Sequence, residues 1–399
     1  MADTLKIGMI GGGKDSFMGE IHRRAIKKCG CIELVSGAFG SNRNSSYETG
    51  RALNLQANRV YGTYRDFFRR EAFLPPEERV DFVSIVTSNA MHYPISMSAL
   101  DAHFPIFCEK PFTCNIDEAL NLMRKMTANQ VPFGVAMVYP AYPALRKAKA
   151  MLEEKALGTI RKVVVEYRLG WMAPRIENAG NRQALWRSDP RRGGPAGCLA
   201  DLASHCFYLA EWLTGLSVVD LTSDMRPTVP GRVIDDDCTV LARFNNGVRG
   251  YFLASQIETG AADGLAFQIY GDKAAMLWKQ IDPGVIRLRA VDGSVTSIGE
   301  SVPPPSPFCP PTPFGNNEAY VDALAKSYLS FAAFAKAGKI INPDPGLDFV
   351  SPPEGLRMVA FVDAVLKNNA DAQINPNDDT PPPPPPKWQS LEVPPVNDL

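Results

Sequence analysis

The sequence has little of several features that would mark particular classes of function. Its 42 basic and 43 acidic residues leave a formal net charge of −1, so no basic field is available for nucleic acid or anionic lipid. No apolar run approaches the roughly 20 residues that a membrane-spanning helix needs. The opening residues, MADTLKIGMIGGG, do not resemble a secretory leader. We therefore expect a cytoplasmic protein that binds small molecules rather than nucleic acid or membrane.

Cysteine and histidine are informative because they are scarce or scattered. None of the eight cysteines falls in a CxxC pair, so most are expected to be reduced and buried. Only four histidines occur, which are His22, His92, His103 and His205. Each one that stands near a carboxylate or follows a strand is a candidate for chemistry.

The first third of the chain alternates between two hydrophobic patterns. Apolar runs of strand length occur at 5–10, 32–39, 80–87, 105–108 and 132–138, and helical periodicity occurs between them, for example at 116–129. Such alternation predicts βαβ units and a parallel sheet, which is an α/β fold. A chain of 399 residues with 45% hydrophobic content is long enough for a second domain.

The loop after the first expected strand is rich in glycine. Gly11, Gly13 and Gly19 allow a tight turn and close approach to a pyrophosphate, which the amides of the next helix would bind. The spacing departs from GxGxxG, as if residues 14–16 had been inserted. A purely structural turn is the alternative, but the position after strand one favours a Rossmann dinucleotide-binding domain over residues 1–138.

The end of the second expected strand bears on the choice of cofactor. Phe39-Gly40-Ser41-Asn42-Arg43 contains no acid that could accept from a ribose 2′-hydroxyl. Ser41, Asn42 and Arg43 could instead hold a 2′-phosphate, which favours NADP over NAD. The alternative is an arginine on a solvated loop.

Charged residues follow the fourth expected strand in the stretch CEKPF. Glu109 and Lys110 stand at its carboxyl end, where ligands bind in open α/β sheets. Asp201 and His205, four residues apart in a helical stretch, would share one face, so the carboxylate could orient the imidazole. Oxidising a carbinol needs a base and a cation for the developing alkoxide, and His205 and Lys110 could supply them. The alternative is a surface ion pair.

A zinc site is an alternative, because Cys198 and Cys206 flank Asp201 and His205 in the sequence. Catalytic zinc needs three convergent ligands, and the two cysteines do not obviously share a face with Asp201 and His205. We therefore expect no metal.

Taken together, these motifs resemble the Gfo/Idh/MocA oxidoreductases, the family of glucose-fructose oxidoreductase and inositol dehydrogenase. The motifs are the glycine loop with His22 after it, residues 87–92 (TSNAMH), Glu109-Lys110-Pro111 and residues 201–205 (DLASH), and the resemblance covers roughly residues 5–370. It implies a Rossmann domain followed by an open-faced sheet domain, a nicotinamide cofactor, and a sugar or cyclitol substrate.

Carried over position by position, the resemblance also implies roles for individual residues. Lys110 matches the family's catalytic lysine, His205 its catalytic histidine, and Asp201 the carboxylate of its DxxxH element. Residues expected on the cofactor side are Thr87, Asn89, His92 and Glu109. The glycine-loop insertion and the absent ribose acid depart from the family pattern and leave the cofactor, NADP or NAD, open.

From residue 159 onward, long strand-like runs joined by turns predict a largely antiparallel sheet, and helical periodicity returns at 317–336 and 354–368. We expect an α+β domain at 139–370 for substrate binding and oligomerisation. One sheet face would need covering, so a homo-oligomer, dimer or tetramer, is expected. The proline-rich tail at 371–399 could bind an aromatic groove or lie on its own protein or a neighbouring subunit.

Substrate candidates are aromatic side chains that could stack on a pyranose ring, together with one guanidinium donor. They are Tyr139, Tyr142, Trp171, Trp186 and Arg187, although aromatics at such positions are more often core. The sequence thus predicts an NAD(P)-dependent sugar or cyclitol dehydrogenase. The alternatives are a glycoside-cleaving enzyme that uses transient oxidation, and a noncatalytic sensor, against which the presence of Lys110, Asp201 and His205 argues.

Overall fold

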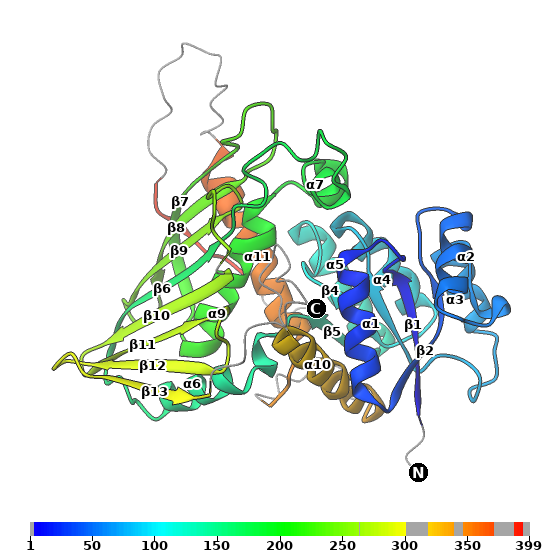
Figure 1. Cartoon of the computed structure of the whole chain (residues 1–399), viewed down its shortest axis with the longest axis horizontal. Coiled ribbons are helices and arrows are strands. Elements are labelled where there is room, and N and C mark those ends of the chain that lie inside the picture. The colour runs from blue at the N-terminus through cyan, green and yellow to red at the C-terminus, as the bar shows by residue number, and fades with distance from the viewer. Residues whose placement is uncertain (1–3, 263, 301–317, 339–345, 371–386, 394–399) are drawn as a thin grey trace. The chain divides into compact units, whose positions relative to one another are not determined.

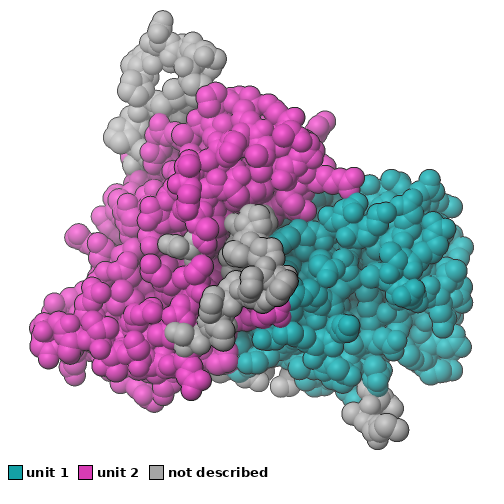
Figure 2. All heavy atoms as spheres, viewed as in Figure 1, with its two compact units in different colours: residues 1–141, 320–356, 395–399 teal, residues 142–319, 357–394 magenta. Residues whose placement is uncertain are grey.

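The computed structural model describes residues 4–262, 264–300, 318–338, 346–370 and 387–393. The chain divides into two compact units (Figure 2). The first unit is built from residues 1–141 and 320–356, and the second from residues 142–319 and 357–394. Within the described ranges, no helix is long and apolar enough to cross a bilayer.

The first unit contains a five-stranded sheet in the order β2-β1-β3-β4-β5, and all its strands are parallel (Figure 1). Its strands are β1 (Leu5–Gly11), β2 (Ile32–Ala38), β3 (Phe82–Val86), β4 (Ile106–Glu109) and β5 (Phe133–Ala136). Helices follow them at α1 (Phe17–Cys29), α2 (Arg43–Ala52), α3 (Tyr64–Glu71), α4 (His92–Asp101) and α5 (Ile116–Asn129). The predicted α/β fold is confirmed. The strand order reverses between β1 and β3, the position where such sheets bind ligands at the carboxyl ends of their strands.

The central strands are apolar because both faces of the sheet are covered. Every residue of β3 is buried, and β4 is buried along its whole length up to its last residue, Glu109. Such continuous apolar runs are typical of parallel strands that pack between helices.

Helix α10 (Glu318–Lys336) returns to this unit after the whole second sheet has been made. Its Tyr328 is fully buried with its ring 4.8 Å from that of Phe107 on β4, and its Phe331 stacks on Phe107 at 5.2 Å. A linear boundary at residue 138 does not include this helix, which belongs to the first unit because its aromatic residues pack in that unit's core.

The second unit contains a nine-stranded sheet in the order β13-β12-β11-β10-β6-β9-β8-β7-β14. All its pairs are antiparallel except β6 with β9, in agreement with the predicted largely antiparallel sheet. The strands are β6 (Ile160–Arg168), β7 (Val218–Arg226), β8 (Asp237–Phe244), β9 (Arg249–Ser255), β10 (Gly264–Gly271), β11 (Ala274–Lys279), β12 (Val285–Ala290), β13 (Val295–Gly299) and β14 (Gln389–Ser390).

Helices cover one face of this sheet. The remaining helices are α6 (Pro143–Glu153), α7 (Arg182–Arg187), α8 (Pro190–Gly193), α9 (Ser204–Thr214) and α11 (Pro352–Asn368). Phe361 of α11 stacks on Phe207 of α9 at 4.4 Å, and both rings approach Phe252 of β9. On β8, Val240 and Ala242 are buried while Leu241 is 42% exposed, so the opposite face is open.

The described end of the tail lies on this unit. Trp388 stacks beneath the guanidinium of Arg243 at 3.8 Å, Gln389–Ser390 pair with β7, and Leu391 is buried. The proline run at 381–386 lies outside the described residues.

Candidate active site

The glycine loop has the geometry of a dinucleotide cradle. Gly11 and Gly12 have positive φ angles of 83° and 62°, and a Cβ on Gly11 would lie 2.2 Å from the carbonyl oxygen of Val86. A Cβ on Gly19 would come within 2.6 Å of Gly12, so the first turn of α1 packs directly on the loop. The amides at this helix start can therefore lie close to a bound pyrophosphate.

Lys14, the first of the three inserted residues of the loop, is anchored on α2. The amide of Lys14 donates to Oγ1 of Thr49 at 3.2 Å, and its ammonium pairs with Glu48 at 3.2 Å. Ser16 caps α1 by accepting from the amide of Gly19. The insertion therefore keeps both the turn and the helix start that the motif requires.

The three polar residues after β2 take different positions. Asn42 caps α2, with its side-chain oxygen accepting from the amide of Ser45 at 2.9 Å, and Ser41 is exposed. The side chain of Arg43 is 71% exposed and lies 3.7 Å from the carboxylate of Asp66. An exposed guanidinium at a helix N-terminus can bind a phosphate, although Asp66 competes for it.

The loop after β3 contributes one unusual group. The hydroxyl of Thr87 is buried, and it has no hydrogen-bond partner among the described residues. A buried polar atom without a protein partner is rare in folded proteins, and water, an ion or a bound ligand can satisfy it. Together with the glycine cradle, this hydroxyl fits a dinucleotide at the carboxyl ends of β1 and β3.

His92 connects two loops of the first unit. Its ring is fully buried, with Nδ1 2.8 Å from the carbonyl oxygen of Pro111 and Nε2 3.3 Å from that of Thr87. Burial lowers the pKa of His92, so the ring is neutral and donates to one carbonyl at a time. Asn89 is also buried nearby in sequence. The cofactor roles of His92 and Asn89 stay predictions.

Glu109 is the last residue of β4 and Lys110 follows it, and the structure connects them with three further side chains that the sequence does not indicate. Oε1 of Glu109 lies 2.7 Å from Nε2 of His22, and Oε2 accepts the amide of Lys110 at 3.1 Å. Nδ1 of His22 lies 2.6 Å from the hydroxyl of Tyr328, which lies 2.7 Å from that of Ser84. His22 could have been suspected from its place after the glycine loop, whereas nothing in the sequence connects Tyr328 with this position.

Asp201 and His205 lie in the second unit at the start of a helix. Residues Leu199–Ala203 form a π-helical turn and α9 begins at Ser204, so the predicted regular helix is correct only from there on. Oδ2 of Asp201 accepts from Nε of Arg187 at 3.0 Å and from the side-chain amide nitrogen, Nε2, of Gln256 at 2.9 Å. The ring of His205 is 8% exposed and lies edge-on to Tyr167. Turns of π-helix occur frequently at functional sites.

Arg187 connects the predicted substrate residues with the predicted catalytic carboxylate. Its guanidinium lies 4.2 Å from the ring centre of Trp186 and 5.7 Å from that of Trp171, while Nη1 donates to Gln183. The sequence suggested the aromatic residues and Arg187, but it gave no indication that Arg187 binds Asp201. Tyr139 and Tyr142 are 1% and 2% exposed, and Tyr142 packs edge-on against Trp278.

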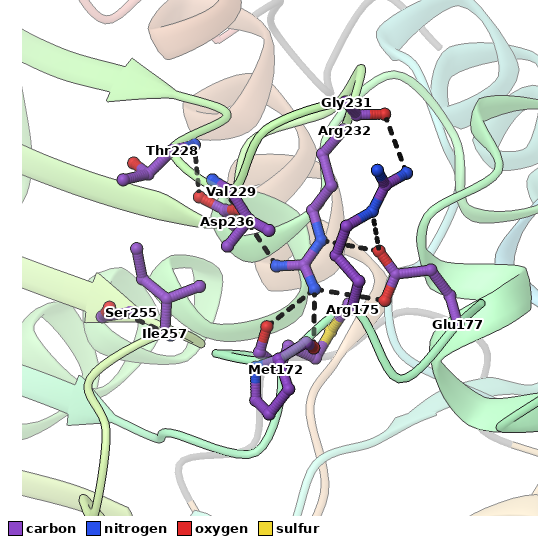
Figure 3. A network of polar contacts seen from close by, with 11 residues as sticks. Met172, Arg175, Glu177, Thr228, Val229, Gly231, Arg232, Asp236, Ser255 and Ile257 are labelled. Atoms are coloured by element: carbon purple, nitrogen blue, oxygen red, sulfur yellow. Dashed lines mark hydrogen bonds and ion pairs between the residues drawn. The ribbon is translucent and has the colours of Figure 1, made fainter. Parts of the chain in front are cut away.

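A buried ionic network fixes the loop that carries Trp171 (Figure 3). Arg232 donates to Glu177 at 2.9 Å, to Asp236 at 3.0 Å and to the carbonyl oxygen of Met172 at 2.7 Å. Arg232, Glu177 and Asp236 are all buried, and Arg175 lies 3.9 Å from Glu177, so two guanidinium groups face two carboxylates.

The neighbouring Asp235 fixes the start of the π-helical turn. Its two carboxylate oxygens accept the amides of Gly197 and Leu199, each at 2.6 Å. Burial raises the pKa of Asp235 to about 6, and the two amides oppose this shift. Two residues after Leu199 the chain reaches Asp201, so Asp235 sets where this segment begins.

The cysteines near this segment do not gather with other ligands. Burial raises the pKa of both the Cys198 and the Cys206 thiols, so both thiols are protonated at neutral pH. Among the described residues, no three His, Cys, Asp or Glu side chains form a group that could hold a metal ion.

Comparisons with known proteins agree with this architecture. Residues 5–137 match the model of the oxidoreductase family with an NAD-binding Rossmann fold, and residues 145–277 match the GFO/IDH/MocA C-terminal domain. The two matches together define an NAD(P)-binding oxidoreductase. The chain belongs to the Gfo/Idh/MocA family, as the motifs predicted.

Individual proteins of known sequence or structure resemble this chain at low sequence identity. The chain is 28% identical to the uncharacterized oxidoreductase YfiI of Bacillus subtilis, over 83% of this chain and 86% of the relative. It is 26% identical to levoglucosan dehydrogenase of Pseudarthrobacter phenanthrenivorans, over 69% of this chain and 73% of the relative. Its structure matches that of an inositol dehydrogenase homolog complexed with NAD+ from Azotobacter vinelandii, with a TM-score of 0.85, 26% identity and 98% of each chain covered.

Proposed function

We propose that the protein is an NAD(P)-dependent dehydrogenase that oxidises a hydroxyl-bearing carbon of a sugar or cyclitol, or reduces the corresponding ketone. The observation that carries this proposal is a dinucleotide cradle whose sheet also presents Lys110 at the carboxyl end of β4. The chain's similarity to levoglucosan dehydrogenase and to an inositol dehydrogenase homolog supports the substrate class.

Lys110 and His205 would divide the two tasks of carbinol oxidation. The imidazole of His205 would remove the hydroxyl proton, and the ammonium of Lys110 would stabilise the developing alkoxide. A bound oxidised nicotinamide would accept the hydride. Arg187 and Gln256 both donate to one oxygen of Asp201, which would hold this carboxylate in the orientation that supports His205.

NADP is the cofactor that we propose in preference to NAD. The support comes from the end of β2, where no carboxylate stands to accept from a ribose 2′-hydroxyl and Arg43 is exposed at the start of α2. Thr87, with its buried hydroxyl, would bind the dinucleotide from the end of β3.

The substrate would be identified by testing sugars and cyclitols with both NAD and NADP, followed by Lys110→Met in the best pair. This substitution keeps much of the side chain's bulk but removes the cation that acts mainly in the transition state. We expect kcat to fall by roughly 10² or more, with the Kd of the dinucleotide nearly unchanged. Lys147→Met, an exposed lysine on α6, is the matched control and should change neither value.

His205→Ala tests the base separately. The pH profile of kcat/KM should lose the ionisation step on its acidic side, since no general base remains to be deprotonated. Near-normal turnover in Lys110→Met, or an unchanged profile in His205→Ala, would refute these roles. Release of a sugar from a glycoside without net reduction of the cofactor would instead indicate the glycoside-cleaving alternative.

A further inference from the structure

The buried contacts behind Lys110 form one continuous chain of hydrogen bonds. It runs from Ser84 on β3 to Tyr328 on α10, then to His22 on α1 and to Glu109 on β4. Ser84, Tyr328 and His22 are all fully buried, and Glu109 is 8% exposed. Four different elements of the first unit therefore contribute to the position of one carboxylate.

Each proton in this chain can be assigned because the partners are few. The hydroxyl of Ser84 has Tyr328 as its partner among the described residues, so the proton of Ser84 must point to the oxygen of Tyr328 to be satisfied. Burial raises the pKa of Tyr328 well above its usual value, so the phenol keeps its own proton and donates it to Nδ1 of His22. The imidazole then carries its proton on Nε2 and donates to Oε1 of Glu109.

The second oxygen of Glu109 accepts a different hydrogen bond. Oε2 accepts from the backbone amide of Lys110, the residue next along the chain. A carboxylate held by His22 on one oxygen has little rotational freedom, so its other oxygen fixes the direction in which the chain leaves β4. The orientation of the turn that presents Lys110 thus depends on the protonation pattern of His22.

A proton relay is the obvious alternative, and burial argues against it. A relay that removes the substrate proton must end in solvent, whereas this chain ends at Ser84, whose side chain has no exposed surface. A hydrogen-bond chain that ends inside the protein can orient groups but cannot release a proton.

We propose that Tyr328 is a positioning residue that holds His22 in the tautomer protonated on Nε2, so that Glu109 accepts from both His22 and the amide of Lys110. The catalytic consequence rests on the function proposed above for Lys110. The helix that carries Tyr328 comes after the whole second sheet in the chain, so the hydrogen bond to His22 forms only when α10 has packed on the first sheet.

Nitrogen NMR of histidine-labelled protein tests the tautomer without any substrate. With four histidines in the chain, the signals can be assigned by single substitutions. We expect His22 to show a protonated Nε2 and an Nδ1 that accepts a hydrogen bond. In Tyr328→Phe, the Nδ1 signal should move to the position of a nitrogen that has no donor. Protonation of His22 on Nδ1, or on both nitrogens, in the unchanged protein near neutral pH would overturn the assignment.

Kinetics test the positioning role. Tyr328→Phe keeps the ring and should lower kcat by about tenfold, with the Kd of the dinucleotide unchanged, as loss of a supporting hydrogen bond does elsewhere. Ser327→Ala, one residue earlier on α10, removes a hydroxyl that bonds to Asp348 and should leave the His22 signals and kcat unchanged. Ser84→Ala should keep the His22 tautomer, because Tyr328 can still donate.

The outcomes separate this inference from the proposed function. An altered His22 signal in Tyr328→Phe together with an unchanged kcat would overturn the positioning role while Lys110 stays catalytic. If the unchanged protein oxidised none of the sugars or cyclitols, the proposed function would fail, yet the NMR measurement would still decide the tautomer. If Tyr328→Phe did not fold, the signals of the unchanged protein and of Ser84→Ala would still decide the assignment.

Discussion

Arg43 is the single residue on which the cofactor preference depends most directly. Its guanidinium is exposed at the first position of α2. The carboxylate of Asp66 lies 3.7 Å away, far enough that a phosphate could compete with it for the guanidinium. A 2′-phosphate would gain a charge-assisted hydrogen bond from Arg43, whereas a 2′-hydroxyl would gain much less. In Arg43→Ala we therefore expect the Kd of NADP to rise on the order of tenfold and that of NAD to change little.

Arg51→Ala is the matched control, because Arg51 is exposed in the last turn of the same helix. It removes an equal charge from α2 while leaving the N-terminus intact, so both dissociation constants should stay as they were. Equal losses for NAD and NADP in Arg43→Ala, or no loss at all, would remove the phosphate interpretation.

At the scale of single elements, the segment that carries Asp201 and His205 is stabilised by a titrating group. Asp235, which binds the amides of Gly197 and Leu199, has a pKa of about 6 against an ordinary value of 3.8. The folded protein therefore binds more protons than the unfolded chain between about pH 4 and pH 6. Because of this difference, the contribution of Asp235 to stability is full below about pH 4 and is lost as the pH rises through 6.

Asp235→Asn should remove this pH dependence, because asparagine resembles the protonated acid and does not titrate. The unchanged protein loses stability over this range and the variant does not. The free energy of unfolding of the variant minus that of the unchanged protein should therefore rise by about 3 kcal/mol between pH 4 and pH 7. Denaturant titrations at several pH values measure the difference. Asp292→Asn, which replaces an exposed acid whose pKa is lowered by Ser294, is the control and should show almost no change over this range, because Asp292 is ionised in both states above about pH 4. If the difference between Asp235→Asn and the unchanged protein stayed constant over this range, the raised pKa of Asp235 would be contradicted.

The same elements show what could be predicted from the sequence and what could not. Strands such as β3 and β4 were predictable because parallel strands buried on both faces leave continuous apolar runs. The position of Lys110 directly after such a strand was predictable for the same reason, while its catalytic role stays a prediction. The π-helical turn at Leu199–Ala203 was not, because its start depends on hydrogen bonds that backbone amides donate to Asp235, 36 residues away from Leu199 in the chain.

Long-range packing explains the other differences. Tyr328 reads as an ordinary aromatic residue in an amphipathic helix, and only the packing of α10 on the first sheet brings its hydroxyl to His22. Likewise, Gln256 and Arg187 have no motif of their own, yet both donate to Asp201. Local periodicity contains no information on which distant side chain supplies the second partner of a polar group.

At the scale of the whole molecule, the open face of the second sheet predicts how copies of the chain associate. Leu241 pairs across the strands with Thr222 on one side and Tyr251 on the other, and Tyr251 pairs with Val164. These four side chains form a row across the face opposite the helices, and none of them is fully buried. A broad, partly apolar sheet face is typically covered by another chain, and a twofold interface would use the same row from both copies.

We therefore expect the protein to be a homo-oligomer, which Leu241→Lys would disrupt. A twofold interface contains the substituted residue from both copies. Two desolvated ammonium groups would therefore face an apolar surface and weaken the association. Sedimentation or light scattering should show a mass above 43.6 kDa for the unchanged protein and a shift towards 43.6 kDa for the variant. Val295→Lys, at a 56% exposed position on the edge strand β13, should leave the mass unchanged. An unchanged protein that is monomeric at micromolar concentration, or a variant that keeps the larger mass, would show that this row is not the interface.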